Sequence, residues 1–305
     1  MPDAGPRSSI ALALHEAAER LERAGVAQPR REARALWATL AGVNAGDVWL
    51  CADRGTSDVL PPEFWESVER RSSGIPFAYA VGRVSFRHLE LKLDARALIP
   101  RPETEGLVDL VLDYCAAYHA QRATRNAVSW GKGERRRGKG GVAADIGTGC
   151  GCLALALATE GEFDRVIAID RSPDAAALAR ENIDLVEPSV PVAVREGDLL
   201  APLVERCAVI VANPPYLTEA EYVELDPAVR QFEPREALVS GPDGLDATRA
   251  LLAGARSRLE PGGLLAIEID ERRARAVRDI AREHGWRAMV RQDLFGRERY
   301  LLGTM

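Results

Sequence analysis

The sequence is poor in the residues on which several kinds of site depend. It contains only four histidines in 305 residues, and all of them lie away from the glycine-rich and Asn-Pro-Pro segments described below. They are His15, His88, His119 and His284. A histidine general base, a catalytic triad or a zinc site is therefore not expected. The five cysteines are odd in number and scattered, which argues against a disulfide framework.

Long apolar runs are also missing. No run approaches the length needed to cross a bilayer, and the first apolar stretch, at 10–14, is followed at once by His15 and Glu16. We therefore expect no signal peptide, no membrane contact and a cytoplasmic protein. The composition that is present, 47% hydrophobic and 28% charged residues, is ordinary for a globular chain long enough to form two domains.

Apolar residues at 209–212 predict a short buried strand, and the segment 213–216, Asn-Pro-Pro-Tyr, follows it directly. Because proline cannot donate to a sheet ladder, the strand must end at Asn213, at the carboxyl edge where open α/β sheets bind ligands. The Asn213 oxygen and a carbonyl of the turn can accept both hydrogens of an NH2 group, and Tyr216 offers a flat face for a planar amide or base. The segment predicts a site that presents NH2 to an electrophile, unless it is only an Asn-Pro turn. Its candidate catalytic residues are Asn213, Pro214, Pro215 and Tyr216.

A second short strand, predicted at 142–146, runs into a glycine-rich loop at 147–151 and then into a helix at 152–159. Glycines allow the backbone to approach a ligand closely, and a helix N-terminus carries partial positive charge. A third strand ends at Asp170, about 20 residues beyond the loop, the spacing at which a carboxylate binds ribose hydroxyls. This order of elements predicts a nucleotide-binding βαβ unit.

The nucleotide is narrowed by two departures from the dinucleotide fingerprint. The third glycine comes one residue early, and Asp145 stands two residues before the first glycine. That carboxylate would repel a pyrophosphate but would suit the ammonium or sulfonium of S-adenosyl-L-methionine, which we predict as the cofactor in preference to NAD. Asp198 can bind the adenine amine with Leu199 against the ring, or it can be a helix cap or turn residue. The candidate cofactor-binding residues are Asp145, Gly147, Thr148, Gly149, Cys150, Gly151, Asp170, Asp198, Leu199 and Asn213, and no metal ligand is predicted.

The beginning of the chain predicts a helical domain at 1–73. Apolar residues recur on one helical face between a Ser9 cap and Gly25. Alternating residues then predict a β-hairpin connector within 74–102, and 103–305 reads as a doubly wound α/β sheet. The stripe of the first helix comprises Ile10, Leu14, Ala17, Leu21 and Ala24.

Residues 121–141 interrupt the last region with a different composition. They hold seven basic residues against one acid, together with five glycines, so we predict a flexible charged loop inserted before the first sheet strand. Its charge of +6, taken from the chain's −6, leaves −12 on the remainder. A solvated insertion is the simplest interpretation, and contact with RNA is the alternative. The acidic remainder argues against stable binding to nucleic acid.

Together these motifs resemble the HemK-type (PrmC) protein-(glutamine-N5) methyltransferases that modify peptide chain release factors. The resemblance covers roughly residues 74–305. The family usually has Glu-Ile-Gly where this chain has Glu-Ile-Asp at 268–270, which puts the turn at Asp270 in question. The matching segments are 98–105, 145–151, Asp170, Asp198, 213–216, 232–234 and 241–245.

The resemblance implies a class I, Rossmann-like methyltransferase fold with a seven-stranded mixed sheet, and a small N-terminal helical domain that helps to recognise the substrate. It implies transfer of a methyl group from S-adenosyl-L-methionine to the side-chain amide nitrogen (N5) of the glutamine in the Gly-Gly-Gln loop of class I peptide chain release factors. Alternative substrates are a glutamine of a ribosomal protein and, with less support, the N6 amine of adenine in DNA or RNA. A non-enzymatic cofactor-sensing or scaffold protein is the remaining alternative function.

The segment 101–105, Arg-Pro-Glu-Thr-Glu, has two interpretations. The residues alone predict that Thr104 or the acids cap a helix at 106–119 and that Arg101 pairs with a glutamate. The resemblance instead places the segment over the cofactor pocket. Both can hold, because a cap can fix the loop that covers a site.

Overall fold

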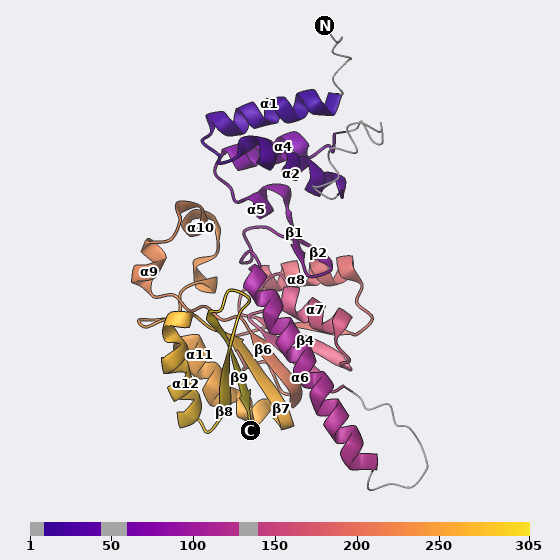
Figure 1. Ribbon diagram of the computed structural model, residues 1–305, viewed down its shortest axis with the longest axis vertical. Helices are drawn as coiled ribbons and strands as arrows, with labels where there is room; N and C mark the ends of the chain where they lie inside the picture. Colours follow the sequence, from indigo (N-terminus) through magenta and orange to yellow (C-terminus); the bar gives the residue numbers. More distant parts are fainter. Residues whose placement is uncertain (1–8, 44–59, 128–139) are drawn as a thin grey trace. The chain divides into compact units, whose positions relative to one another are not determined.

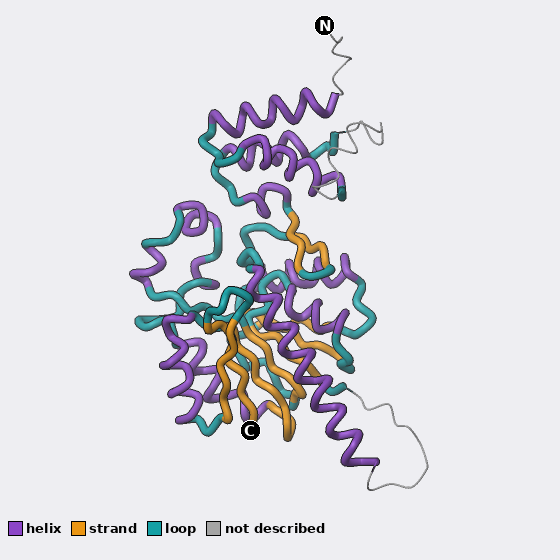
Figure 2. The backbone as a smooth tube through the Cα atoms, in the orientation of Figure 1, coloured by secondary structure: helices purple, strands orange, loops and turns teal. Residues whose placement is uncertain are grey.

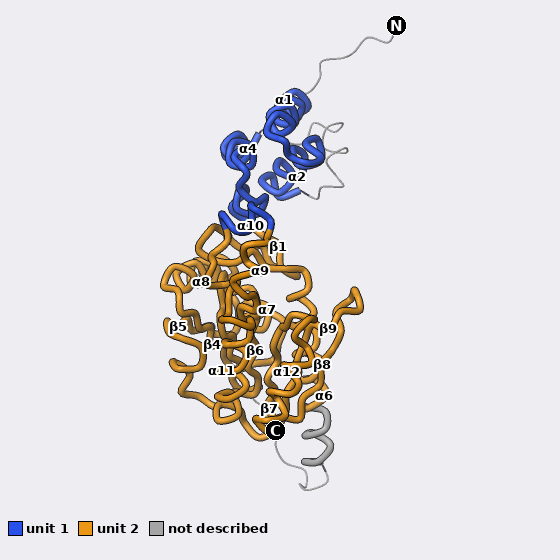
Figure 3. The backbone as a smooth tube through the Cα atoms, turned by 90° about the vertical axis from the view of Figure 1, so that its left-hand side faces the viewer, with its two compact units in different colours: residues 1–83, 226–232 blue, residues 84–225, 233–305 orange. Residues whose placement is uncertain are grey.

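The computed structural model describes residues 9–43, 60–127 and 140–305, and the chain divides into two compact units. Unit 1 comprises residues 1–83 with 226–232, and unit 2 comprises residues 84–225 with 233–305 (Figure 3). The glycine-rich loop and the Asn-Pro-Pro-Tyr segment both belong to unit 2.

Unit 1 is made of helices around a small apolar core. The stripe predicted for its first helix is buried at Ile10, Ala17 and Leu21, but Ala24 is exposed because the helix ends at Arg23. Trp37 joins the buried residues from the second helix. The helices are α1 (Ser9–Arg23), α2 (Pro29–Ala41), α4 (Phe64–Ser72) and α5 (Phe77–Val81), and the short helix α10 (Pro227–Phe232) groups with them.

Unit 2 contains a mixed sheet flanked by helices (Figure 1). It has seven strands in the order β5-β4-β3-β6-β7-β9-β8. Neighbouring strands from β5 to β7 are parallel, and β9 runs antiparallel to both β7 and β8. The predicted class I methyltransferase sheet is therefore confirmed, with the last two strands forming its antiparallel hairpin. The strands are β3 (Val142–Ile146), β4 (Arg165–Asp170), β5 (Val192–Glu196), β6 (Cys207–Ala212), β7 (Leu259–Glu268), β8 (Arg287–Gln292) and β9 (Glu298–Thr304).

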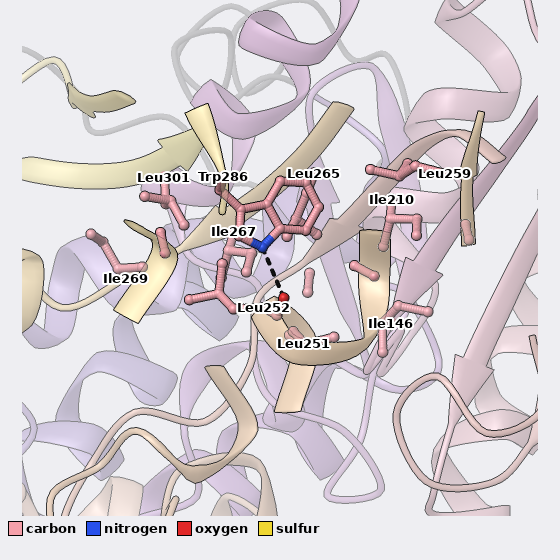
Figure 4. Close-up of a cluster of buried hydrophobic side chains, with 14 of the residues drawn as sticks. Ile146, Ile210, Leu251, Leu252, Leu259, Leu265, Ile267, Ile269, Trp286 and Leu301 are labelled. Atoms are coloured by element: carbon pink, nitrogen blue, oxygen red, sulfur yellow. Dashed lines mark hydrogen bonds between the residues drawn. The ribbon is translucent and has the colours of Figure 1, made fainter. Parts of the chain in front are cut away.

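Helices cover both faces of this sheet (Figure 2). On one side, α6 packs against β7 and α7, while α7 and α8 pack against β4 and β5. On the other side, α11 and α12 bury the apolar cluster drawn in Figure 4, where the Trp286 indole N–H donates to the Leu252 carbonyl at 2.8 Å. These helices are α6 (Pro102–Ala127), α7 (Cys152–Glu160), α8 (Pro173–Val186), α11 (Asp246–Gly254) and α12 (Ala274–Glu283).

Shorter elements complete unit 2. A two-stranded hairpin, β1 (Arg83–Phe86) and β2 (Leu89–Lys92), stands where alternating residues predict one. The segment after β6 carries α9 (Glu219–Val223) and the 3-10 turn η2 (Arg235–Ala237). Two further 3-10 turns, η3 (Ala255–Arg258) and η4 (Glu271–Arg273), flank β7.

The helix before β3 is longer than the prediction at 106–119. Helix α6 begins at Pro102 and continues to Ala127, so the prediction of a loop over 121–141 is wrong for 121–127. Residues 128–139 of the predicted insertion lie outside the described residues. None of the described helices is both long and apolar enough to cross a bilayer.

Candidate active site

A cavity of about 460 Å³ lies at the carboxyl edge of the parallel strands of unit 2. It collects residues from the ends of β3, β4, β5 and β6, which is the expected ligand position in an open α/β sheet. Among the predicted site residues, Asp145, Gly151 and Tyr216 are not part of its lining. Those that do line it are Gly147, Thr148, Gly149, Cys150, Asp170, Asp198, Leu199, Asn213, Pro214 and Pro215.

The glycine loop forms a cradle at the end of β3. Gly147 and Gly149 have φ angles of 76° and 56°, in the left-handed region that favours glycine. The backbone N–H groups of Gly147 and Thr148 both donate to the Ile169 carbonyl, at 2.8 and 2.9 Å. The loop is therefore tied to β4, and its backbone is exposed to the cavity without side chains at the two glycines.

Asp170 ends β4 and links that strand to the glycine loop. Its Oδ2 accepts the Gly149 N–H at 2.8 Å, and its Oδ1 accepts the Ser172 N–H at 2.9 Å. Burial raises the pKa of this carboxyl. Each carboxylate oxygen has more than one acceptor site, so Asp170 can also bind two vicinal hydroxyls of a ligand.

Asp145 lies behind the loop and is completely buried. Its Oδ2 accepts the Thr148 hydroxyl at 2.6 Å and the Ala154 N–H at 3.1 Å, while its Oδ1 has no hydrogen-bond partner among the described residues. Burial raises its pKa to about 7. Asp145 thus fixes the loop and the first turn of α7, and its predicted interaction with a cationic ligand stays a prediction.

Asn213 follows β6 directly, as its two prolines predict, and its side chain is held from behind. Its Nδ2 donates to the Thr104 hydroxyl at 3.1 Å, and that hydroxyl donates to Glu268 Oε2 at 2.7 Å. Thr104 and Glu268 are each 2% exposed. Neither residue is among the candidate site residues predicted from the sequence. Thr104 is predicted as a possible cap within a segment that the resemblance places over the cofactor pocket, and Glu268 only as part of a Glu-Ile-Asp sequence.

Two segments that match the resemblance meet beside the cavity. Arg101 pairs with a glutamate, as predicted, since its Nη2 lies 2.7 Å from Glu233 Oε1. The Ile99 N–H also donates to Glu233, at 3.2 Å to Oε2, and the Glu233 side chain is 1% exposed. Pro100 and Pro234, next to these residues, line the cavity. The ion pair therefore joins two parts of the cavity wall that are 132 residues apart.

Tyr216 and Asp270 occupy the neighbouring turns. Burial raises the pKa of the Tyr216 hydroxyl to about 12, so it is neutral. Its predicted stacking on an amide plane stays a prediction. Asp270 has φ −75° and ψ 130°, an extended conformation that needs no glycine, and its carboxylate accepts the Arg272 N–H at the start of η4. The departure from Glu-Ile-Gly therefore leaves the turn intact.

Family models match two parts of the chain. The "PrmC N-terminal domain" matches residues 13–82, and the "Methyltransferase small domain" matches residues 134–231. Among solved structures, a methyltransferase from Pyrococcus furiosus is similar at a TM-score of 0.51 and 20% identity, covering 77% of this chain and 96% of that one. The hMettl16 catalytic domain in complex with MAT2A 3′UTR hairpin 6 is similar at 0.53 and 15% identity, covering 79% of this chain and 80% of that one. These two likenesses support the fold.

Curated relatives match almost the whole chain. The release factor glutamine methyltransferase of Deinococcus radiodurans is 40% identical over 94% of this chain and 95% of its own. The release factor glutamine methyltransferase of Moorella thermoacetica is 38% identical over 96% of this chain and 98% of its own. The chain therefore belongs to the release factor glutamine methyltransferase family and is a methyltransferase enzyme.

Proposed function

We propose that this protein transfers a methyl group from S-adenosyl-L-methionine to the side-chain amide nitrogen of the glutamine in the Gly-Gly-Gln loop of class I peptide chain release factors. The observation that carries the proposal is the orientation of Asn213. Its amide nitrogen is engaged by Thr104, which directs its oxygen toward an incoming donor such as a substrate NH2. The names of the relatives support release factors as the substrate.

The residues at the ends of β3, β4 and β5 fit S-adenosyl-L-methionine. Asp170 offers acceptors for ribose hydroxyls, and Asp198 and Leu199 line the wall where we expect adenine. The buried Asp145 keeps one oxygen without a partner among the described residues, so its ionised form leaves negative charge behind the glycine loop. That charge favours a cationic ligand over a pyrophosphate. When bound, this cofactor supplies a methyl group already activated by the positive charge on sulfur.

The protein's own residues hold the nucleophile. Asn213 Oδ1 and the Pro214 carbonyl accept the two hydrogens of the glutamine amide, and the Pro-Pro turn keeps that carbonyl outside any helix. Since an amide nitrogen is a weak nucleophile, alignment with the methyl carbon and sulfur is the main task, and such orientation can be worth on the order of 7–11 kcal/mol. The proton leaves the cationic product to water, so no histidine is required.

A labelling experiment tests the proposed function. The protein is incubated with isotope-labelled S-adenosyl-L-methionine and, in separate reactions, a class I release factor, ribosomal proteins, and DNA or RNA, followed by mass spectrometry of the labelled product. We expect one methyl group on the Gly-Gly-Gln glutamine, and none on a release factor in which that glutamine is replaced by alanine. Label on a ribosomal protein or on adenine instead would assign one of the alternative substrates, and no incorporation anywhere would contradict the proposal.

A further inference from the structure

Three hydrogen-bonded side chains connect Asn213, in the Asn-Pro-Pro-Tyr segment, to the buried end of β7. Asn213, after β6, donates to Thr104 in the first turn of α6, and Thr104 donates to Glu268, the last residue of β7. The two distances are 3.1 and 2.7 Å. Thr104 and Glu268 are both buried. Asn213 and Thr104 line the cavity, whereas Glu268 does not.

When Glu268 is ionised, the three side chains can form their two hydrogen bonds with the donors pointing in only one direction, from Asn213 toward Glu268. A carboxylate accepts and cannot donate, so the single hydroxyl hydrogen of Thr104 is committed to Glu268. The Thr104 oxygen can then only accept from Asn213. A primary amide has a donor end and an acceptor end, so Asn213 must turn its NH2 toward Thr104 and its oxygen the other way.

A protonated Glu268 removes this constraint. The carboxylic acid can donate to the Thr104 oxygen, which frees the hydroxyl hydrogen to be donated to Asn213 Oδ1. The Asn213 amide then turns over and presents its own NH2 to the cavity. Two NH2 groups facing each other cannot form the bond on which substrate placement depends.

We propose that Thr104 and Glu268 are positioning residues that fix the amide orientation of Asn213, so that a substrate NH2 meets an acceptor. This inference rests on the proposed function, because it concerns a substrate that brings an NH2 group to Asn213. Neither residue touches the reacting atoms. Glu268 acts through its hydrogen bond to Thr104, and Thr104 acts through its hydrogen bond to Asn213. The consequence is that methyl transfer depends on the ionisation of a buried carboxyl group.

The charges around Glu268 come from three directions. Arg101, before α6, and Arg299, on β9, favour its ionised form, while Glu103 on α6 opposes it. Tyr216, after β6, and Tyr300, on β9, also interact with its charge.

Burial outweighs the two arginines and raises the Glu268 pKa to about 7. Since the ionised form holds Asn213 in the productive orientation, activity should rise as pH increases through this range and fall below it. Asp145 has a pKa of about 7 as well, but it faces the glycine loop, so substitutions at Glu268 separate the two.

Substitutions at Thr104 test the chain directly. Thr104→Val keeps the shape and removes the hydroxyl, and we expect kcat for release factor methylation to fall roughly 10-fold to 100-fold while donor affinity measured by calorimetry is unchanged. Thr104→Ser restores the hydroxyl and should restore most of kcat. The matched control is Thr159→Val at the end of α7, which deletes a hydroxyl bonded only to its own helix and should leave kcat unchanged.

The pH profile gives a readout that a merely structural role would not move. At saturating donor, the wild-type kcat/KM for the release factor should show an acidic limb near pH 7. Glu268→Gln should lose that limb, because a neutral amide can either donate to or accept from Thr104. Thr104→Val should lose it too. An unchanged limb in both variants would overturn the inference, and so would a Thr104→Val enzyme with wild-type kcat. If Thr104→Val does not fold, Thr104→Ser and Glu268→Gln still decide the question through their pH profiles.

Failure of this inference and failure of the proposed function differ in the wild-type protein. If wild-type protein does not methylate the release factor, the proposed function fails. If it does, and the variants keep both the rate and the acidic limb, only the positioning role of Thr104 and Glu268 fails.

Discussion

Two buried carboxyl groups, those of Asp145 and Glu268, each accept the hydroxyl of a threonine that lines the cavity. Asp145 on β3 and Glu268 on β7 are 0% and 2% exposed, and each accepts a threonine hydroxyl, at 2.6 Å from Thr148 and 2.7 Å from Thr104. Burial raises the pKa of both to about 7. The Asp145–Thr148 pair and the Glu268–Thr104 pair differ in what they hold in place.

The Asp145–Thr148 pair holds main-chain segments in place. Its carboxylate also accepts the Ala154 N–H at 3.1 Å, so it joins the glycine loop to the first turn of α7. The Glu268–Thr104 pair holds a side chain in place, because the Thr104 hydroxyl accepts a hydrogen bond from Asn213. Under the proposed function, Asp145 and Thr148 shape a surface for the donor, whereas Glu268 and Thr104 set the polarity of one amide. Variants of the first pair should affect donor binding, and variants of the second pair should affect turnover.

The largest expected effect comes from removing the Asn213 side chain, which Thr104 and Glu268 hold in place. Asn213→Ala deletes a preorganised acceptor for the substrate NH2, and we expect kcat to fall by about 10²–10³-fold. Donor affinity, measured by calorimetry, should change much less. Full turnover by this variant would remove the role assigned to Asn213.

The second expected effect concerns stability and not turnover: the free energy of unfolding should depend on pH through Asp145. The folded pKa of Asp145, about 7, is above its ordinary value of 3.8. The folded protein therefore holds a proton that the unfolded chain has lost, and this contribution to stability is present at low pH and is lost as pH rises toward 7. The shift corresponds to a few kcal/mol, on the order of 1.4 kcal/mol for each unit.

The check is the free energy of unfolding of wild-type protein and Asp145→Asn across pH 4.5–8, in denaturant. The variant should show a shallower decline with rising pH. Parallel curves would mean that Asp145 does not keep its proton on folding.

A further contrast is expected between the two threonines. Thr148→Val removes the hydroxyl that Asp145 accepts, so the donor should bind about 10-fold more weakly, while kcat at saturating donor stays near that of wild type. This is the opposite of the pattern expected for Thr104→Val. Donor calorimetry and steady-state kinetics on both variants, with Thr159→Val as the shared control, would break the comparison if the two patterns coincide.

The smallest effect is expected for the basic residues of the insertion predicted at 121–141. If that segment is a solvated insertion, as its composition predicts, Arg135→Gln, Arg136→Gln and Arg137→Gln together should change release factor methylation by less than about twofold. These three positions lie outside the described residues. A collapse of activity on isolated release factor would assign the segment to substrate binding, and weakened methylation only in the presence of RNA would support the RNA alternative.

The parts of the site that follow from local sequence were predictable. Gly147, Asp170 and Asn213 each stand directly at a strand end, where a glycine, an acid or a proline pair carries its own structural meaning. The partners that orient Asn213 were not predictable in this way. Thr104 is 109 residues from Asn213 and 164 residues from Glu268, and only the folded sheet brings them together.

The error in the helix before β3 has a local cause. The prediction grouped 121–141 by its basic charge, but residues 121–127 contain no glycine or proline, and the glycines begin at Gly131. Arginine, alanine and glutamine are compatible with a helix, so α6 continues to Ala127. Helix-breaking residues, and not charge, mark where a helix can end.

The most direct measurement is a crystal structure of this protein with S-adenosyl-L-homocysteine and a peptide containing the Gly-Gly-Gln sequence. We expect Asn213 Oδ1 within about 3 Å of the glutamine side-chain nitrogen. The same nitrogen should face the sulfur from which the methyl group would come. A cofactor sulfur remote from Asn213, or an Asn213 side chain that turns its own NH2 toward the glutamine, would contradict the account.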